Sequence, residues 1–258
     1  MQKLFTITLI FFIIFTLTYT QTSLELGWEW YNKRAEGAKG TEASAAPVDK
    51  AIKYFLTSIK DPASEESAAV GLLKGYYFKA TFVPMKKNER KELYKAGREL
   101  GEKMRKKFPG SLDMKYWYGV NMGKWAEIYS KIAAAREGVA DKLKKLSEEI
   151  IEADPVYDRG SAYMFLGRVH HQTPKIPFIL KWPSKKISKE CYKKAIEIAP
   201  GRIISRYYLA DLLADRGKKD EAIKILEELI LKKPEPDNLV EDRSDLAGVK
   251  RLLEKLKK

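Results

Sequence analysis

The chain has 258 residues, of which 45% are hydrophobic and 33% charged, so it can form one large domain or two small ones. Its formal net charge of +14 could attract nucleic acid, anionic lipid or an acidic protein. Because the lysines alternate with glutamates and form no long block, we interpret them as the solvated outer faces of helices. One cysteine, Cys191, and two adjacent histidines, His170 and His171, exclude an internal disulfide and predict no metal site.

The first 20 residues differ in composition from all that follow. Lys3 makes the N-terminal end of this segment positively charged, and no further charge occurs within residues 1–20. The centre of the segment, Leu9 to Phe15, is continuously apolar. This layout predicts a secretory signal peptide, cleaved before Gln21, and a periplasmic or cell-envelope location. The segment is slightly short for a membrane span of about 20 residues. An uncleaved N-terminal anchor is the alternative, and we expect no other contact with a membrane.

Residues 21–258 are predicted to form a single all-α domain of antiparallel helix pairs. Five amphipathic segments end at a proline, which lacks an N–H and restricts the residue before it. These prolines are Pro62, Pro109, Pro155, Pro200 and Pro234. The interval from Pro200 to Pro234 equals the 34-residue tetratricopeptide period. No alternating pattern typical of strands occurs. The sequence therefore predicts an α-solenoid of stacked, tetratricopeptide-like helix pairs.

The expected helices follow in chain order. The first three pairs are predicted at 24–38 with 47–60, 67–82 with 88–108, and 112–136 with 139–153. In the fourth pair, Tyr163 and Leu166 mark the first helix, Tyr192 and Ala195 mark the second, and a proline-containing insertion over 173–183 separates them. On this alignment His170 is a packed helix residue and not a ligand.

The fifth pair matches the tetratricopeptide pattern position by position. Ala210 and Leu213 take packing positions in its first helix, Gly217 lies in the turn, and Ala222 and Leu226 face inward from its second helix. A small residue at position 222 lets the two helices cross closely. A last amphipathic helix over 241–256 is expected to cap the stack.

The sequence contains no recognisable catalytic constellation. There is no glycine-rich phosphate loop, nucleophile elbow or paired zinc-ligand spacing. With two histidines and one cysteine, general acid–base and nucleophilic residues are scarce. We therefore predict a protein that is not an enzyme and uses no cofactor or metal.

Binding is better supported than catalysis, because stacked helix pairs form a concave face lined by the first helix of each pair. The aromatic third such helix offers Trp117, Asn121, Lys124 and Trp125, whose spacings of three to four suit one face and an apolar or anionic ligand. Weaker candidates on later helices are Arg168, His171 and Tyr207. Alternatively, the tryptophans belong to the core and Lys124 lies at its rim.

Several features follow one another in a distinctive order along the chain. They are Tyr116-Trp117-Tyr118 with Lys124-Trp125, the ending Glu152-Ala153-Asp154-Pro155 followed by Gly160, Leu166-Gly167-Arg168, the proline-containing insertion, Lys193 to Pro200, and Glu241-Asp242. In this order the chain resembles the T-component family of tripartite ATP-independent periplasmic (TRAP) transporters, over much of residues 21–258 and most strongly after residue 112. One departure is the lack of a lipid-attachment cysteine, which many members of that family carry.

The resemblance implies an accessory protein for solute uptake. Such a protein docks the periplasmic substrate-binding protein of a transporter and carries a small hydrophobic ligand in a central cavity. The alternative is an envelope scaffold whose concave face receives peptide segments of other proteins. Microtubule-dynamics regulators with similar helix pairs are a more distant match, and the export signal argues against them. We expect no nucleic acid partner, and the sequence leaves homo-oligomer formation open.

Overall fold

The computed structural model describes residues 21–129, 137–175 and 180–258. These residues form helices and connecting turns, with one isolated β-bridge between Lys39 and Glu42. The predicted all-α class is therefore confirmed. The predicted signal segment, residues 1–20, lies outside the described residues. The same holds for residues 130–136 of a predicted helix and for residues 176–179 of the insertion.

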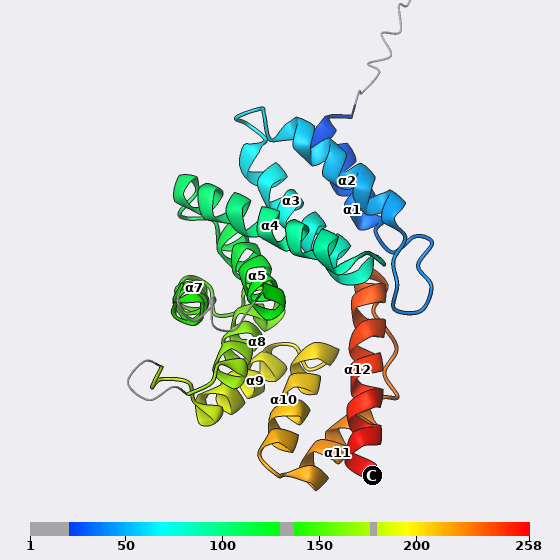
Figure 1. Ribbon diagram of the computed structural model, residues 1–258, viewed down its shortest axis with the longest axis vertical. Helices are drawn as coiled ribbons and strands as arrows, with labels where there is room; N and C mark the ends of the chain where they lie inside the picture. The colour runs from blue at the N-terminus through cyan, green and yellow to red at the C-terminus, as the bar shows by residue number, and fades with distance from the viewer. Residues whose placement is uncertain (1–20, 130–136, 176–179) are drawn as a thin grey trace, which may run out of the picture.

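The helices follow one another as antiparallel pairs (Figure 1). The pairs are α1 (Ser23–Asn32) with α2 (Ala45–Ser58), α3 (Glu65–Phe82) with α4 (Lys87–Lys107), α5 (Leu112–Tyr129) with α7 (Val139–Ala153), α8 (Tyr157–Gln172) with α9 (Lys185–Ile198), and α10 (Ile203–Asp215) with α11 (Lys219–Leu229). A 3-10 turn, η1 (Pro236–Asn238), then leads into α12 (Leu239–Lys257). Each helix packs against the next one in sequence.

Local signals mark the boundaries of the first helix. Thr22 caps α1 in a reciprocal capping box, in which its hydroxyl accepts from the backbone N–H of Glu25 at 3.2 Å. The sequence places the end of this first helix at residue 38, but α1 ends at Asn32. The reason is the turn that follows, where Gly37 and Gly40 both adopt the left-handed region that favours glycine.

The first three helices meet at an aromatic ring. The fully buried side chain of Phe55 in α2 lies between two glycines, Gly27 of α1 and Gly71 of α3. A Cβ atom at either glycine would lie within 2.6 Å of the Phe55 ring. The close packing of α1, α2 and α3 therefore depends on the absence of side chains at these positions.

Gly71→Ala is expected to lower the free energy of unfolding by about 1–3 kcal/mol, because the new methyl group overpacks the core and outweighs the better helix propensity of alanine. Thermal unfolding followed by circular dichroism measures the change. Gly110→Ala is the matched control, since a Cβ at Gly110 meets no atom within 4 Å. Equal melting temperatures for the two variants would contradict this account of the packing.

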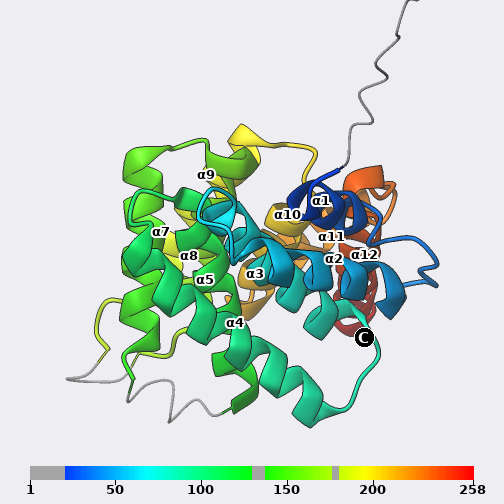
Figure 2. The same ribbon diagram turned by 90° about the horizontal axis from the view of Figure 1, so that it is seen from above.

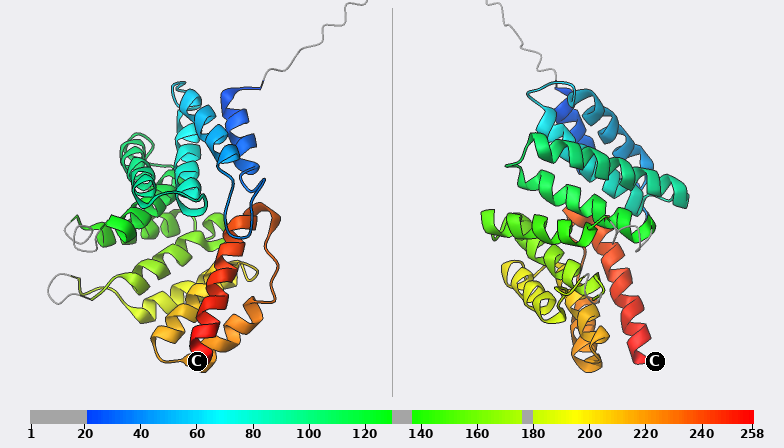
Figure 3. Two further views of the ribbon diagram at one scale, coloured as in Figure 1. Left: turned by 45° about the vertical axis from the view of Figure 1, so that its right-hand side comes forward. Right: turned by 60° about the vertical axis from the view of Figure 1, so that its left-hand side comes forward.

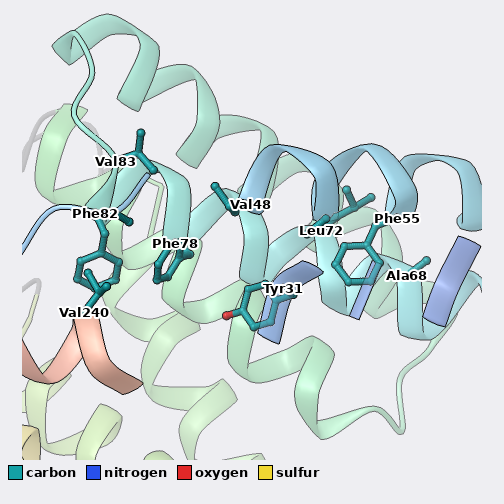
Figure 4. Close-up of a cluster of buried hydrophobic side chains, with 11 residues drawn as sticks. Tyr31, Val48, Phe55, Ala68, Leu72, Phe78, Phe82, Val83 and Val240 are labelled. Atoms are coloured by element: carbon teal, nitrogen blue, oxygen red, sulfur yellow. The ribbon is translucent and has the colours of Figure 1, made fainter. Parts of the chain in front are cut away.

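The last helix returns to the first pair and closes the stack. In Figures 1 and 3, α12 begins beside the N-terminal helices and runs along one side of the molecule back to α10 and α11, where the chain ends. At its beginning, Val240 is fully buried in one hydrophobic cluster with Tyr31, Phe78 and Phe82 (Figure 4). Arg34, which follows α1, donates from Nε to Glu241 Oε1 at 2.9 Å and also contacts the carbonyl oxygen of Asp237. The expected capping helix therefore joins the two ends of the solenoid.

Candidate functional site

With α12 in this position, the helices line a central cavity of about 640 Å³. Its lining comes from α1, α3, α5, α8, α10 and α12 and from the turns beside them. The second helices of the pairs, α2, α4, α7, α9 and α11, contribute no lining residue. In the view from above, α4 and α7 lie at the edge of the molecule (Figure 2). The concave face is therefore built from the first helix of each pair, as the repeat pattern predicts.

Aromatic side chains form a continuous wall along one side of this cavity. The ring of Trp117 in α5 lies 5.5 Å from that of Tyr77 in α3 and 5.4 Å from that of Tyr116. Tyr116 in turn lies 5.7 Å from Phe165 and 5.5 Å from Tyr157, both of α8. The lining aromatic residues are Tyr31, Tyr77, Phe82, Tyr116, Trp117, Tyr157, Phe165 and Tyr208. Such a wall can pack against apolar groups or the face of a planar cation.

Charged side chains make up much of the remaining lining. The basic residues are Arg34, Lys74, Lys124, Arg159, Arg168 and Arg202, and the acidic ones are Asp113, Glu127, Asp158, Glu235, Asp237, Glu241, Asp242 and Asp245. Six basic groups thus face eight carboxyl groups, although the whole chain carries a net charge of +14. Four of the carboxyl groups lie on η1 and the first turns of α12.

A strained turn forms part of the cavity wall. At the start of α8, Asp158 and Arg159 have positive φ angles of 40° and 58°, and Gly160 follows at 79°. Such angles cost roughly 1–3 kcal/mol for each non-glycine residue. Two arginines hold the turn: Arg202 donates to the carbonyl oxygen of Asp158 at 2.8 Å, and Arg159 makes a bidentate pair with Glu235 at 2.7 and 2.9 Å. Strain maintained in this way is typical of functional sites.

Three of the residues predicted to bind a ligand line the cavity: Trp117, Lys124 and Arg168. Lys124 pairs with Glu127 at 2.8 Å. The Arg168 guanidinium donates to Asp211 at 2.8 Å and lies 4.3 Å above the Tyr208 ring. Lys124 and Arg168 are thus held by neighbouring side chains, while Trp117 is half-buried in the aromatic wall.

Asn121 and Trp125 do not share the cavity face with Trp117. Asn121 is fully buried and donates to the carbonyl oxygens of Leu73 at 3.0 Å and Trp117 at 2.9 Å, so it joins α5 to α3. Trp125 is buried toward α4, with the Arg98 guanidinium 3.9 Å from its ring. Each step of four residues turns about 40° round a helix. Trp125 therefore lies about 80° away from Trp117.

His171 and Tyr207 also lie outside the cavity lining. His171 is buried beside Asp215, with Nε2 and Oδ2 2.8 Å apart, and burial lowers its pKa. Tyr207 packs against the backbone of α12 at Gly248, while its neighbour Tyr208 faces the cavity. His170 and Cys191, the remaining histidine and the single cysteine, are buried and have structural roles. Burial raises the pKa of the Cys191 thiol to about 11.

Sequence reasoning missed the acidic side of the cavity. Asp237, Glu241 and Asp245 recur at intervals of four residues, a spacing that places side chains on one helix face. Like charges at this spacing destabilise a helix, so an acidic stripe in a strongly basic chain is a signal that could have been used.

Among the described residues, no group of three or more His, Cys, Asp or Glu residues is arranged to hold a metal ion. Nor does any described helix combine the length and apolar character needed to cross a bilayer.

The fold and the cavity together define a tetratricopeptide-like helical-repeat protein with a closed concave face. The family model "Regulator of microtubule dynamics protein 1-3" matches residues 48–257, and the chain belongs to that family. The resemblance to TRAP transporter T-components is not supported, and the family ranked as more distant is the one that matches. No match was found among curated protein sequences.

One solved structure shows the same fold class. The thermophilic TPR protein TTC0263 of Thermus thermophilus superimposes with a TM-score of 0.58 at 15% sequence identity. The alignment covers 87% of this chain and 97% of that one. A crystal structure of MamA aligns with a TM-score of 0.47 at 18% identity and covers 72% of this chain and 88% of that chain. At these identities the likeness concerns the fold alone.

Proposed function

We propose that this protein is a non-catalytic adaptor that holds a short segment of a partner polypeptide in its central cavity. The observation that carries the proposal is the cavity itself, which six helices distributed along the whole chain line with aromatic and charged side chains. Burial of aromatic residues in such a concave site supplies most of the binding energy at protein interfaces. A volume of about 640 Å³ suits a few side chains and not a whole domain.

The test is selection from a displayed library of random linear 12-residue peptides, followed by fluorescence anisotropy of the selected peptides. We expect Trp117→Ala and Tyr208→Ala to weaken binding at least about tenfold, because each removes a ring that the segment would contact. Tyr129→Ala is the control, since Tyr129 is an exposed aromatic residue that does not line the cavity. Failure to select any peptide, or equal binding by the Trp117→Ala variant, would refute the adaptor proposal.

A second candidate function is the binding of a small solute, as the transporter resemblance implied. It is favoured by the cavity volume, which lies in the range of about 300–1,000 Å³ typical of ligand pockets. Native mass spectrometry of the exported protein, followed by denaturing extraction, tests it. A co-purifying molecule that is lost in the Trp117→Ala variant supports the small-solute role, whereas a clean ligand-free mass counts against it.

We do not propose a role in microtubule dynamics for this chain, although the matching family is named after that role. Residues 1–20 predict export, and an exported chain would be separated from cytoplasmic microtubules. The periplasmic location and the pairing with a substrate-binding protein remain predictions. Detection of the chain in the periplasmic fraction, with residues 1–20 removed, would support export.

A further inference from the structure

We propose that the cavity recognises a cation, an ammonium or guanidinium group, which pairs with Asp245 and Glu241 while the rest of the ligand packs on the aromatic wall. The inference rests on the proposed binding function and specifies the ligand for the same site. The chemistry is shared by two sources, a lysine or arginine side chain of a partner segment and a free organic amine.

The first observation is that five of the six basic side chains lining the cavity already have a carboxylate partner. Lys124 pairs with Glu127, Arg159 with Glu235, Arg202 with Asp158, Arg34 with Glu241 and Arg168 with Asp211. The Lys74 ammonium lies 5.4 Å from the ring centroids of both Trp28 and Trp117. Lys124, which suggested an anionic ligand from sequence, is therefore not free to receive one.

The second observation is that carboxylate oxygens of α12 remain without partners. The carboxylate of Asp245 has no hydrogen bond or ion pair within the part of the chain that the structure describes. Oε1 of Glu241 accepts from Arg34, but Oε2 is buried and has no hydrogen-bond partner there. A buried acceptor left unpaired costs about 1–3 kcal/mol, more when it is charged. A bound cation would supply the missing donors.

The surroundings of Asp245 favour a cation further. Burial raises the pKa of Asp245 to about 8, and the carboxylates of Asp242 and Glu241 add to the shift. The charged and titratable groups that interact with it are Asp242 and Glu241 of α12, Arg202, Lys124 of α5, Tyr77 of α3, and Tyr207 and Tyr208 of α10. A cation binds the ionised form, so affinity should rise as pH increases from 6 to 8.

The third observation is the neighbouring wall. Tyr77, Trp117 and Tyr208 line the same cavity as Asp245. Aromatic faces attract ammonium and guanidinium groups, and the attraction grows when water is excluded. Carboxylates beside aromatic faces thus match a ligand with a cationic head and an apolar body.

Two sets of probes test the inference on the full chain. The first is the random peptide library, which should yield peptides containing lysine or arginine. The second is 4-phenylbutylamine compared with 4-phenylbutanol, which has the same body and no charge, followed by tryptophan fluorescence. We expect Asp245→Asn to weaken binding of the cationic probes about tenfold or more, because it removes a charge-assisted hydrogen bond. Glu254→Gln is the matched control, since Glu254 is exposed on the same helix and outside the cavity.

The outcomes separate this inference from the proposed function. Basic peptides that depend on both Trp117 and Asp245 support both proposals. Binding of the amine but not the alcohol, without any selected peptide, supports cation recognition, identifies a small amine as the source and overturns the adaptor proposal. Cavity-dependent peptides that lack basic residues, or equal binding of amine and alcohol, overturn cation recognition. A Tyr129→Ala variant that binds as weakly as Trp117→Ala would place binding outside the cavity and overturn both.

Discussion

Val240→Asp is expected to detach the beginning of α12 from the first helix pairs and to open the cavity. Val240 is fully buried among Tyr31, Phe78 and Phe82 (Figure 4). The Arg34 guanidinium, which lies 4.8 Å from the Tyr31 ring, already pairs with Glu241. An unpaired carboxylate there costs several kcal/mol. The charge would also lie beside Glu241 in sequence. Undocking exposes the carboxylate to water and is therefore the less costly response.

Hydrogen–deuterium exchange measures this effect directly. Amides of residues 236–245 should exchange at least about tenfold faster in the Val240→Asp variant, since undocking removes their tertiary protection. Peptide or amine binding in the cavity should be lost as well. Val240→Ala removes two methyl groups without adding charge and should weaken closure by only about 1–2 kcal/mol. Lys250→Asp controls for a new carboxylate on the exposed face of the same helix.

Unchanged exchange over residues 236–245 in Val240→Asp would mean that the contact between α12 and the first helix pairs does not hold the solenoid closed. The Val240→Ala variant then shows whether the burial of Val240 contributes to closure at all. If Val240→Ala is also silent, the burial of Val240 contributes little to closure, and Arg34 with its partners Glu241 and Asp237 would be the remaining candidate.

The helix pairs could be predicted because their signals are local. Proline endings, apolar periodicity and small residues such as Ala222 act within one or two turns. Ala222 is fully buried where α10 and α11 pack together, as predicted. Closure of the solenoid has no such signal. Val240 and Tyr31 are far apart in sequence, and nothing in either segment indicates the other.

The candidate site was predicted in part for the same reason. Trp117 and Lys124 are seven residues apart, so two turns of α5 bring them to the same face. Asn121 and Trp125 do not lie on this face, because each step of four residues rotates the side chain about 40° round α5 toward α4. The acidic residues of α12 enter the cavity only through long-range closure. Reading one helix at a time could not place Asp245 in the same cavity as the aromatic wall.

Asp245→Asn is expected to stabilise the ligand-free protein, and to do so more at pH 8 than at pH 5. Burial raises the pKa of Asp245 to about 8, whereas an aspartate in an unfolded chain titrates near 3.9. The folded protein thus binds this proton more tightly than the unfolded chain. The contribution of protonated Asp245 to the free energy of unfolding is fully present below about pH 4 and is lost as the pH rises through about 8. Asparagine keeps the shape and cannot ionise.

The measurement is the melting temperature of both proteins between pH 5 and 8.5. At pH 8 we expect the variant to gain about 2 kcal/mol, equivalent to about 4–8 °C for a chain of this size. Glu254→Gln should change the melting temperature equally at all pH values. Parallel curves for Asp245→Asn and wild type would show that Asp245 is well solvated when the cavity is empty. A variant that is more stable yet binds cations more weakly has lost a group retained for binding, because a structural carboxylate would lose stability when neutralised.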